Sequence, residues 1–209
     1  MNPIVPAGAL GLARDRMTCD DEPRPVPLGH LVTHEEWLHD WSEREERFEV
    51  VDGVPVMTPP EHPRNLSAAD VLGFRLHEVL GLEWRCLPAA GVRIAPEPLM
   101  TYRIPDLALV RPDAPLDQPL DSSQVELVVE ALSPSTRRED LGRKRRDYAS
   151  AGIPNYLVID RSGAPRLMLL TGPVEGDYPE PGEDAVGEVV TLRIAGHEVT
   201  LRADDLIRS

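Results

Sequence analysis

The sequence has little of what cross-links a chain or anchors it to a membrane. Its 209 residues include two cysteines, Cys19 and Cys86, too few for a disulfide framework or a cysteine metal cluster. We interpret both as free thiols in a reducing compartment and expect a cytoplasmic protein. No apolar run approaches the ~20 residues of a membrane span, and prolines interrupt the first residues before a signal-peptide core forms. We therefore expect no contact with a membrane.

Positive charge is also scarce. The chain has 22 Lys and Arg against 36 Asp and Glu, which gives a net charge of −14. Proteins that bind nucleic acid through a broad basic face neutralise phosphates with many Lys and Arg side chains. The surface as a whole therefore does not suit a polyanion, and any contact with nucleic acid must be local or bridged by metal ions.

Lysine is nearly absent. Of the 22 basic residues, Lys144 is the single lysine, and it lies within the segment RKRRDY. Arginine cannot lose its proton in a protein, whereas lysine can and offers a compact point charge. A site that needs an ammonium group would make Lys144 irreplaceable. A stray lysine on a solvated helix face explains the same pattern equally well.

The first half of the chain predicts an arm, a helix, a hairpin and a second helix. Residues 1–28 are rich in Pro, Gly and Asp, so we expect a disordered or loosely attached arm before a single domain over 29–209. A capping box of Thr33 and Glu36 predicts a helix over 34–44. Asp52-Gly53 between β-branched residues predicts a hairpin, and apolar spacing predicts a helix over 66–80.

The second half of the chain predicts strands around one more helix. That helix begins at a capping box of Thr136 and Glu139 and runs to about Ser150, with Gly152 as its stop. The expected strands cover 84–95 (broken near Pro88), 104–110, 125–132, 155–160, 166–171, 188–194 and 197–201. The alternation predicts an α/β fold, with a mixed α+β sheet that has helices on both sides.

Two carboxylates interrupt otherwise apolar strands. Asp106 lies in IPDLALV, and Glu130 lies in VELVVEAL. Burying an unpaired carboxylate is costly, so each requires a strand end, an ion pair or a metal. Alternation puts Glu130 on one strand face with Val128 and Leu132. Glu130 also lies near the strand's C-terminal end, where open α/β sheets build ligand sites.

Lys144 comes from the helix that follows Glu130. Asp140, Lys144 and Tyr148 are four residues apart and share one helical face, which directs Lys144 at the strand of Glu130. Two carboxylates and an ammonium group around one point suit Mg²⁺-assisted hydrolysis of a phosphodiester. A plain buried ion pair, Asp–Lys or Glu–Lys, explains the spacing alone at least as well.

The segments RFEVVDG, IPDLALV and ELVVEALSPSTRREDLGRKRRDYASAGIPNYLVID together resemble the Uma-type family of bacterial endonucleases, over roughly residues 33–172. The resemblance implies a restriction-endonuclease-like core with a PD-(D/E)XK site that acts on DNA. It implies that Asp106 and Glu130 bind Mg²⁺ or Mn²⁺ and that Lys144 is the active-site lysine, moved from strand to helix. The position where the motif string itself puts lysine is Leu132.

Other residues have a functional and a structural interpretation. The resemblance suggests Glu49 as a third acidic metal ligand, although a carboxylate on the hairpin surface is an equal alternative. It also suggests the main-chain carbonyl of Ala131 as a ligand. Asp140 and Tyr148 orient Lys144 or simply stabilise the helix. His62, between Pro60 and Pro63, could approach the site, but we expect a solvated loop histidine.

The leading functional hypothesis is a metal-dependent endonuclease that hydrolyses DNA. The net charge motivates an alternative: a binding or regulatory protein that keeps the nuclease fold without cleaving. An enzyme that acts only with a basic partner protein lies between the two. Because nucleases of this fold often pair to cut both strands, a homodimer is a further expectation. Glycoside hydrolysis by paired carboxylates finds no support, since aromatic residues make up only 4% of the chain.

Overall fold

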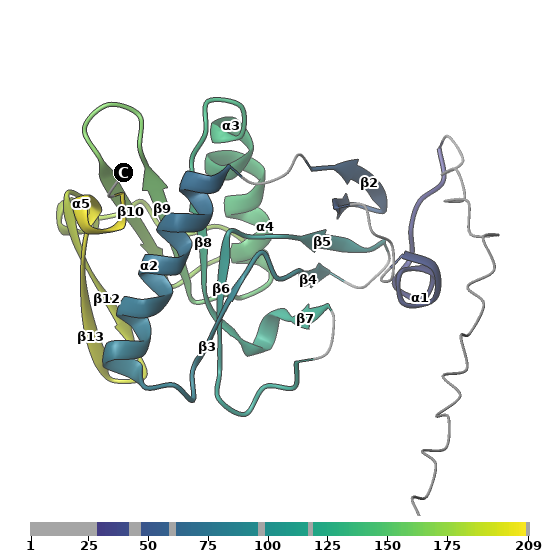
Figure 1. The fold of residues 1–209 in the computed structure, drawn as a ribbon. Coiled ribbons are helices and arrows are strands. Elements are labelled where there is room, and N and C mark those ends of the chain that lie inside the picture. Colours follow the sequence, from purple (N-terminus) through teal and green to yellow (C-terminus); the bar gives the residue numbers. More distant parts are fainter. Residues whose placement is uncertain (1–28, 42–46, 59–61, 96–98, 117–118, 208–209) are drawn as a thin grey trace, which may run out of the picture.

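The computed structural model describes residues 29–41, 47–58, 62–95, 99–116, 119–207 of the chain (Figure 1). The N-terminal arm expected over residues 1–28 lies outside the described residues. None of the helices in the described ranges has the length and apolar character that crossing a bilayer requires.

A six-stranded sheet forms the centre of the fold (Figure 1). In spatial order its strands are β11 (Val186–Gly187), β10 (Arg166–Thr171), β9 (Asn155–Asp160), β8 (Val125–Ala131), β6 (Leu107–Val110) and β3 (Arg85–Pro88). The pair β8–β9 is parallel and the other neighbours are antiparallel. The crossover from β8 to β9 is helical, in three consecutive segments: α3 (Arg137–Glu139), the π-helical η3 (Asp140–Lys144) and α4 (Arg145–Ser150).

A second sheet lies beside the first. Its strands, in spatial order, are β2 (Val54–Met57), β1 (Phe48–Val51), β5 (Thr101–Arg103), β4 (Val92–Ala95) and β7 (Leu120–Asp121). The β1–β2 turn is the predicted one, with Asp52 and Gly53 both at positive φ. Gly91, just before β4, leaves room for the ring of Tyr102, whose hydroxyl lies only 1.8 Å from where a Cβ would stand.

A short helical segment precedes the hairpin. It consists of α1 (His34–Glu36) and the π-helical η1 (Trp37–Trp41), and the Thr33–Glu36 capping box is confirmed. Residues 42–44 of the predicted helix lie outside the described ranges. Trp37 and Trp41, four residues apart, both contact the ring of Phe48.

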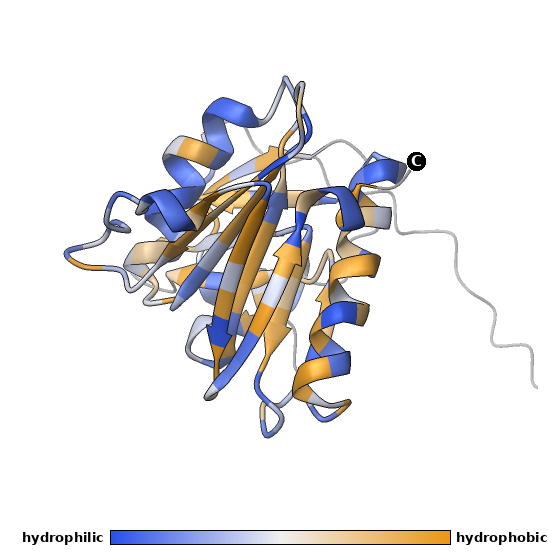
Figure 2. Ribbon diagram, turned by 90° about the vertical axis from the view of Figure 1, so that its left-hand side faces the viewer, coloured by the Kyte–Doolittle hydropathy of each residue, from blue (hydrophilic) through white to orange (hydrophobic). Residues whose placement is uncertain are grey.

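The face of the central sheet opposite the crossover is covered by α2 (Pro63–Leu80), which spans the predicted helix and begins three residues earlier. Ala68, Leu72 and Leu76 pack against Leu127 and Val129 of β8. The hairpin of β12 (Val189–Ile194) and β13 (His197–Arg202), followed by α5 (Ala203–Leu206), completes this core. Figure 2 shows the central strands largely in the hydrophobic colour.

The other face is covered by α4. Tyr148 and Ala149 pack against Val128 of β8 and Tyr156 of β9. The alternation predicted for β8 is therefore confirmed, because Leu127, Val129 and Ala131 belong to one core and Val128 and Leu132 to the other. This arrangement puts the side chain of Glu130 on the face that the crossover helix covers.

Two features of the sequence prediction were incomplete or wrong. The short elements β5, β7, β11 and α5 were not predicted. The capping box at Thr136 does not form, because the Thr136 side chain makes no cap hydrogen bond to the helix. Its hydroxyl instead accepts from the backbone N–H of Ser133 at 3.2 Å and lies 2.9 Å from the Ser133 hydroxyl, so a local turn takes the group that would have capped the helix.

Candidate active site

Asp106 lies directly before β6 and next to the end of β8. Its Oδ2 accepts a hydrogen bond of 2.6 Å from the backbone N–H of Ala131. Leu107, the following residue, pairs with Val129. The buried carboxylate is thereby held beside the residue that follows Glu130, so two strands bring the predicted acids to neighbouring positions.

Glu130 is buried against the crossover helix. Its Oε1 accepts from Lys144 Nζ at 2.8 Å and from the Tyr148 hydroxyl at 2.7 Å. Burial raises the pKa of Glu130 to about 7, and although the charge of Lys144 opposes this shift, the carboxylate of Asp140 adds to it. The side chain is therefore close to the balance between its charged and neutral forms at neutral pH.

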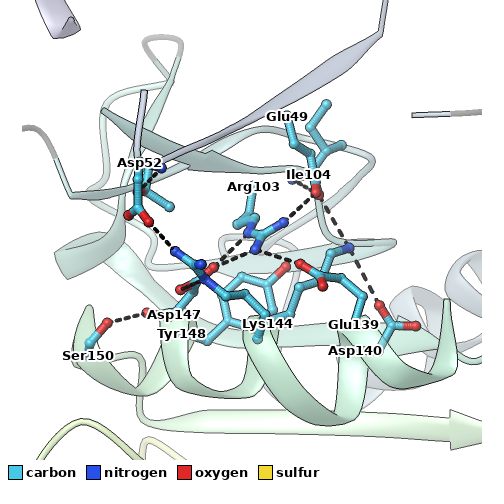
Figure 3. A network of polar contacts seen from close by, with 12 residues as sticks. Glu49, Asp52, Arg103, Ile104, Glu139, Asp140, Lys144, Asp147, Tyr148 and Ser150 are labelled. Carbon is cyan, nitrogen blue, oxygen red and sulfur yellow. Dashed lines mark hydrogen bonds and ion pairs between the residues drawn. The ribbon is translucent and has the colours of Figure 1, made fainter. Parts of the chain in front are cut away.

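Lys144 ends the π-helical segment and points into the protein rather than into solvent (Figure 3). Besides Glu130, its Nζ lies 3.3 Å from Glu49 Oε1 and 3.7 Å from Asp140 Oδ1. Burial alone lowers the pKa of an ammonium group, but these three carboxylates raise the pKa of Lys144 by more. Lys144 is consequently a charged ammonium group at neutral pH in this environment.

Glu49 reaches the site from β1. Its Oε2 pairs with Arg103 Nη1 at 2.8 Å, and its Oε1 accepts from the backbone N–H of Ile104 at 3.0 Å (Figure 3). Burial raises the pKa of Glu49, but Lys144 and Arg103 together lower it below the usual value. The alternative of a hairpin-surface carboxylate is wrong, because Glu49 is only 4% exposed.

Arg103 is a site residue that the sequence prediction missed. It is 1% exposed, and besides Glu49 it pairs with Glu139 at 2.8 Å and with Asp147 at 2.6 Å (Figure 3). It thus joins β5 and β1 to the crossover helix. A signal was available, since an arginine flanked by apolar residues in TYRIPD requires buried partners just as Asp106 does.

Asp140 and Tyr148 lie where the four-residue spacing predicted, on the helix face that carries Lys144. Asp140 is buried and pairs with Lys144, and its backbone carbonyl accepts from the Tyr156 hydroxyl at 3.1 Å. Tyr148 is fully buried and donates to Glu130. Of the predicted group, Glu130, Lys144, Asp140 and Tyr148 are joined by direct contacts, and Asp106 is held on the neighbouring strand by the backbone N–H of Ala131.

His62 has a different place, at the start of α2. It is the N-cap of that helix, where its Nδ1 accepts from the backbone N–H of Arg64 at 3.2 Å, and it is exposed. The expectation of a solvated histidine is therefore correct in exposure, with a capping role in addition.

Comparisons with known proteins identify the family and the fold of the chain. The sequence model of the Uma2 family, described as "Putative restriction endonuclease", matches residues 34–203, which is most of the chain. The chain belongs to the Uma2 family. The resemblance noted in the sequence is thereby confirmed. A search of curated proteins found no match.

A solved structure shows the same fold. It is described as "a putative nuclease belonging to DUF820" from Anabaena variabilis ATCC 29413. The two structures superpose with a TM-score of 0.60 at 14% sequence identity, covering 84% of this chain and 97% of the other. At this identity the likeness concerns the fold alone, and it confirms a mixed α+β fold with a restriction-endonuclease-like core for this Uma2 chain.

The predicted ligand oxygens of this Uma2 chain differ in their hydrogen-bond partners. Both oxygens of Glu49 have partners, whereas only Oε1 of Glu130 hydrogen-bonds within the described residues. The carbonyl of Ala131 accepts from Asn65 Nδ2 at 3.0 Å, a contact that the sequence did not predict. In the described part of the chain, no group of three or more His, Cys, Asp or Glu residues is arranged to hold a metal ion.

Proposed function

We propose that the protein is an endonuclease that hydrolyses phosphodiester bonds in DNA with the help of Mg²⁺ or Mn²⁺. The observation that carries the proposal is that the crossover helix brings Lys144 against Glu130 of β8, while Asp106 occupies the neighbouring position before β6. There, Lys144 Nζ lies 2.8 Å from Glu130 Oε1, and Asp106 bonds to the residue after Glu130. Membership of the Uma2 family and the shared nuclease fold support it.

The donor set fits a hard divalent cation. Mg²⁺ is usually bound through one or two carboxylates plus waters and substrate phosphate. Asp106 and Glu130 supply two carboxylates at neighbouring positions, and Oε2 of Glu130 has no hydrogen-bond partner in the described chain. We therefore assign the metal to Asp106 and Glu130.

Lys144 supplies a fixed positive charge beside these carboxylates. A bound divalent ion would polarise the scissile phosphate and acidify a water molecule. Lys144, which stays protonated, donates hydrogen bonds to the attacking water or to the phosphate and offsets charge that develops there. Its ammonium group already donates a hydrogen bond to Glu130, while Glu49 and Asp140 lie at ion-pair distance and hold it in place.

Glu49 and Tyr148 act through their neighbours in this proposal. Glu49 positions Lys144 and is itself fixed by Arg103, and Tyr148 positions Glu130. A direct bond from Glu49 to the metal stays a prediction, and would require it to release one of its present partners. The carbonyl of Ala131 also stays a predicted ligand, because a carbonyl oxygen that accepts from Asn65 still has a second lone pair.

Cleavage of supercoiled plasmid and of labelled oligonucleotides tests the proposal, with Mg²⁺, Mn²⁺ or a chelator present. We expect metal-dependent cleavage that falls by about 10²–10³-fold in Asp106→Ala and in Lys144→Ala. Lys144→Arg should not restore it, because the planar guanidinium differs in shape from an ammonium group. Arg193→Gln, in the exposed β12–β13 hairpin, is the matched control and should cleave like the wild type.

Cleavage that continues unchanged in both Asp106→Ala and Lys144→Ala would refute the proposed site. Calorimetric titration with Mn²⁺ separates the alternative of a non-cleaving binding protein. That alternative predicts no metal binding and no change in stability on Asp106→Asn. We also propose a cytoplasmic location and a homodimer, as separate expectations. Sedimentation of the purified protein would reveal the homodimer.

A further inference from the structure

A cleft with a volume of about 950 Å³ lies at the end of the central sheet where α2 and α3 begin. Its walls are the first turn of α2, the segments that follow β8 and β9, and the end of α5. The basic side chains that line it are Arg64, Arg137 and Arg161. The proposed chemistry of the active site assigns these arginines no role.

The charge of the cleft is opposite to that of the whole chain. Three arginines line it against one carboxylate, Asp160, which pairs with Arg137 at 2.7 Å. Arg64 and Arg161 have no carboxylate partner among the residues that the structure describes. The cleft is therefore a local positive region in a chain whose net charge is −14. Because the rest of the surface is acidic, a polyanion can bind only at such a local region.

Neutral donors surround these charges. The hydroxyl groups of Ser67, Ser133 and Ser162 line the same cleft. The cleft also adjoins the positive end of the dipole of α2, an 18-residue helix. Arginine guanidinium groups and serine hydroxyl groups are among the groups that contact the backbone phosphates of nucleic acids.

The cleft is connected to the candidate active site. Leu132 and Ser133, which line it, follow Glu130 by two and three residues, so about 7–10 Å of extended chain separates them. Arg161 donates to the side chain of Asn65, and Asn65 donates to the carbonyl of Ala131. The chain from Glu130 to Ser133 therefore spans at most about two or three nucleotides, at a rise of about 3.4 Å per phosphate along one strand.

We propose that this cleft binds the phosphate backbone of the DNA strand on one side of the scissile bond, through Arg64 and Arg161. The inference rests on the proposed nuclease function and adds where the substrate is held. Phosphate contacts fix the position of a protein on nucleic acid without reading its sequence. The cleft therefore positions the strand, and the metal site cuts it.

Binding without cleavage tests this inference separately from catalysis. The affinity of a fluorescently labelled DNA duplex is measured by anisotropy in a chelator, over a range of salt concentrations. For the wild type we expect the logarithm of the affinity to fall linearly with the logarithm of salt concentration. In Arg64→Gln and in Arg161→Gln we expect weaker binding, with the slope reduced by about 0.9 for each phosphate that is no longer neutralised.

Controls distinguish the cleft from general charge and from a free-anion pocket. Arg193→Gln removes one exposed arginine outside the cleft and should leave the slope unchanged. Arg64 is exposed, so its replacement leaves the fold intact even if Arg161→Gln disturbs Asn65. Inorganic phosphate at equal charge concentration should displace the duplex poorly, since one anion cannot replace several phosphates joined in a strand.

Each outcome decides between the two proposals. An unchanged slope in both arginine variants, no binding of the duplex by the wild type, or equal displacement by phosphate overturns the assignment of the cleft. Binding that depends on both arginines, together with no cleavage in any metal, supports the cleft and rejects the nuclease function. Metal-dependent cleavage, together with a wild-type salt dependence of binding in both variants, supports the nuclease function and rejects the assignment of the cleft.

Discussion

The two faces of the central sheet are built from the same strands but differ in polarity, because one packs mainly apolar side chains and the other adds buried charged groups to an apolar core. On one face α2, a regular 18-residue helix, packs Leu72 and Leu76 against an apolar surface. On the other, the crossover helix contains a π-helical segment that buries Asp140 and Lys144. Alternate residues of β8 belong to each face, so a single strand supplies Val129 to one and Glu130 to the other.

The two faces differ in how their buried side chains contribute to the free energy of folding. Burial of apolar side chains is non-directional and contributes roughly in proportion to area. The buried charges on the other face carry desolvation costs that their partners only offset when the geometry is good. Local departures from regular helix are frequent at functional sites. We infer that the face of Glu130 is the one suited to chemistry, and that both faces contribute to stability, one by apolar burial alone and the other also through its buried charge network.

The largest effect is expected at the charged face, from Arg103→Met. Removing Arg103 leaves Glu49 and Asp147 without their central partner, and Glu49 is buried. We expect the free energy of unfolding to fall by about 3–5 kcal/mol, as measured by urea denaturation. Arg143→Met is the matched control, because the side chain of Arg143 is 38% exposed where it pairs with Asp52 and Asp147, so its loss should cost less than about 1 kcal/mol. Equal costs for the two variants would show that the buried network does not stabilise the fold.

A comparable but smaller loss is expected at the apolar face, from Leu72→Ala. Leu72 is fully buried beneath α2, and its truncation should cost about 2–5 kcal/mol through reduced burial and the cavity left behind. Phe74→Ala on the same helix, where Phe74 is 75% exposed, should stay within about 0.5 kcal/mol. Cleavage per folded molecule should remain unchanged in Leu72→Ala. If the variant were fully folded but cleaved less, the two faces of the sheet would not act independently.

The smallest effect is expected from pH. Because burial raises the pKa of Glu130 to about 7 from its usual 4.5, the metal-free protein holds a proton there under acidic conditions. That proton must leave when a cation binds, so Mn²⁺ affinity should fall by up to about tenfold, or about 1.4 kcal/mol, for each pH unit below 7. Titration calorimetry at several pH values measures this. An affinity that is independent of pH would exclude Glu130 as the titrating ligand.

The sign of the stability change follows from the same shift. A carboxyl group whose pKa is raised on folding stabilises the folded state while protonated, and this contribution is lost as pH rises from about 4.5 to 7. Mn²⁺ should therefore raise the melting temperature more at about pH 8 than at about pH 6. Tyr148→Phe sharpens the test. The Tyr148 hydroxyl donates to Glu130 and favours its charged form, so the variant should shift the transition to higher pH.

The central group of the site could be predicted because short-range rules govern it. Alternation along β8 gives the face of Glu130, and the four-residue spacing gives the shared face of Asp140, Lys144 and Tyr148. A carboxylate in an apolar strand signals a special environment, which identified Asp106. The Asp52-Gly53 turn was predictable for the same reason, since it depends on two adjacent residues.

The remaining parts depend on contacts between distant segments. Arg103 lies in β5, a strand of only three residues that shows no periodicity, and meets Glu49 because β5 pairs with β1. Asn65 reaches Ala131 across 66 positions of sequence, a distance that local spacing does not predict. At Thr136 the local motif is present in the sequence, but the capping box does not form. The Thr136 hydroxyl accepts from the backbone N–H of Ser133 instead of capping the helix.

The π-helical segment also constrains how the chain can change in length. A π-helical turn holds about one residue more than an α-helical turn, so the loss of one residue between Asp140 and Lys144 would return the segment to regular α-helix. Asp140 would then precede Lys144 by three positions instead of four, a spacing that still leaves both residues on one helix face. Within the crossover helix, this segment is therefore the place where the loss of one residue would change the helical phase least.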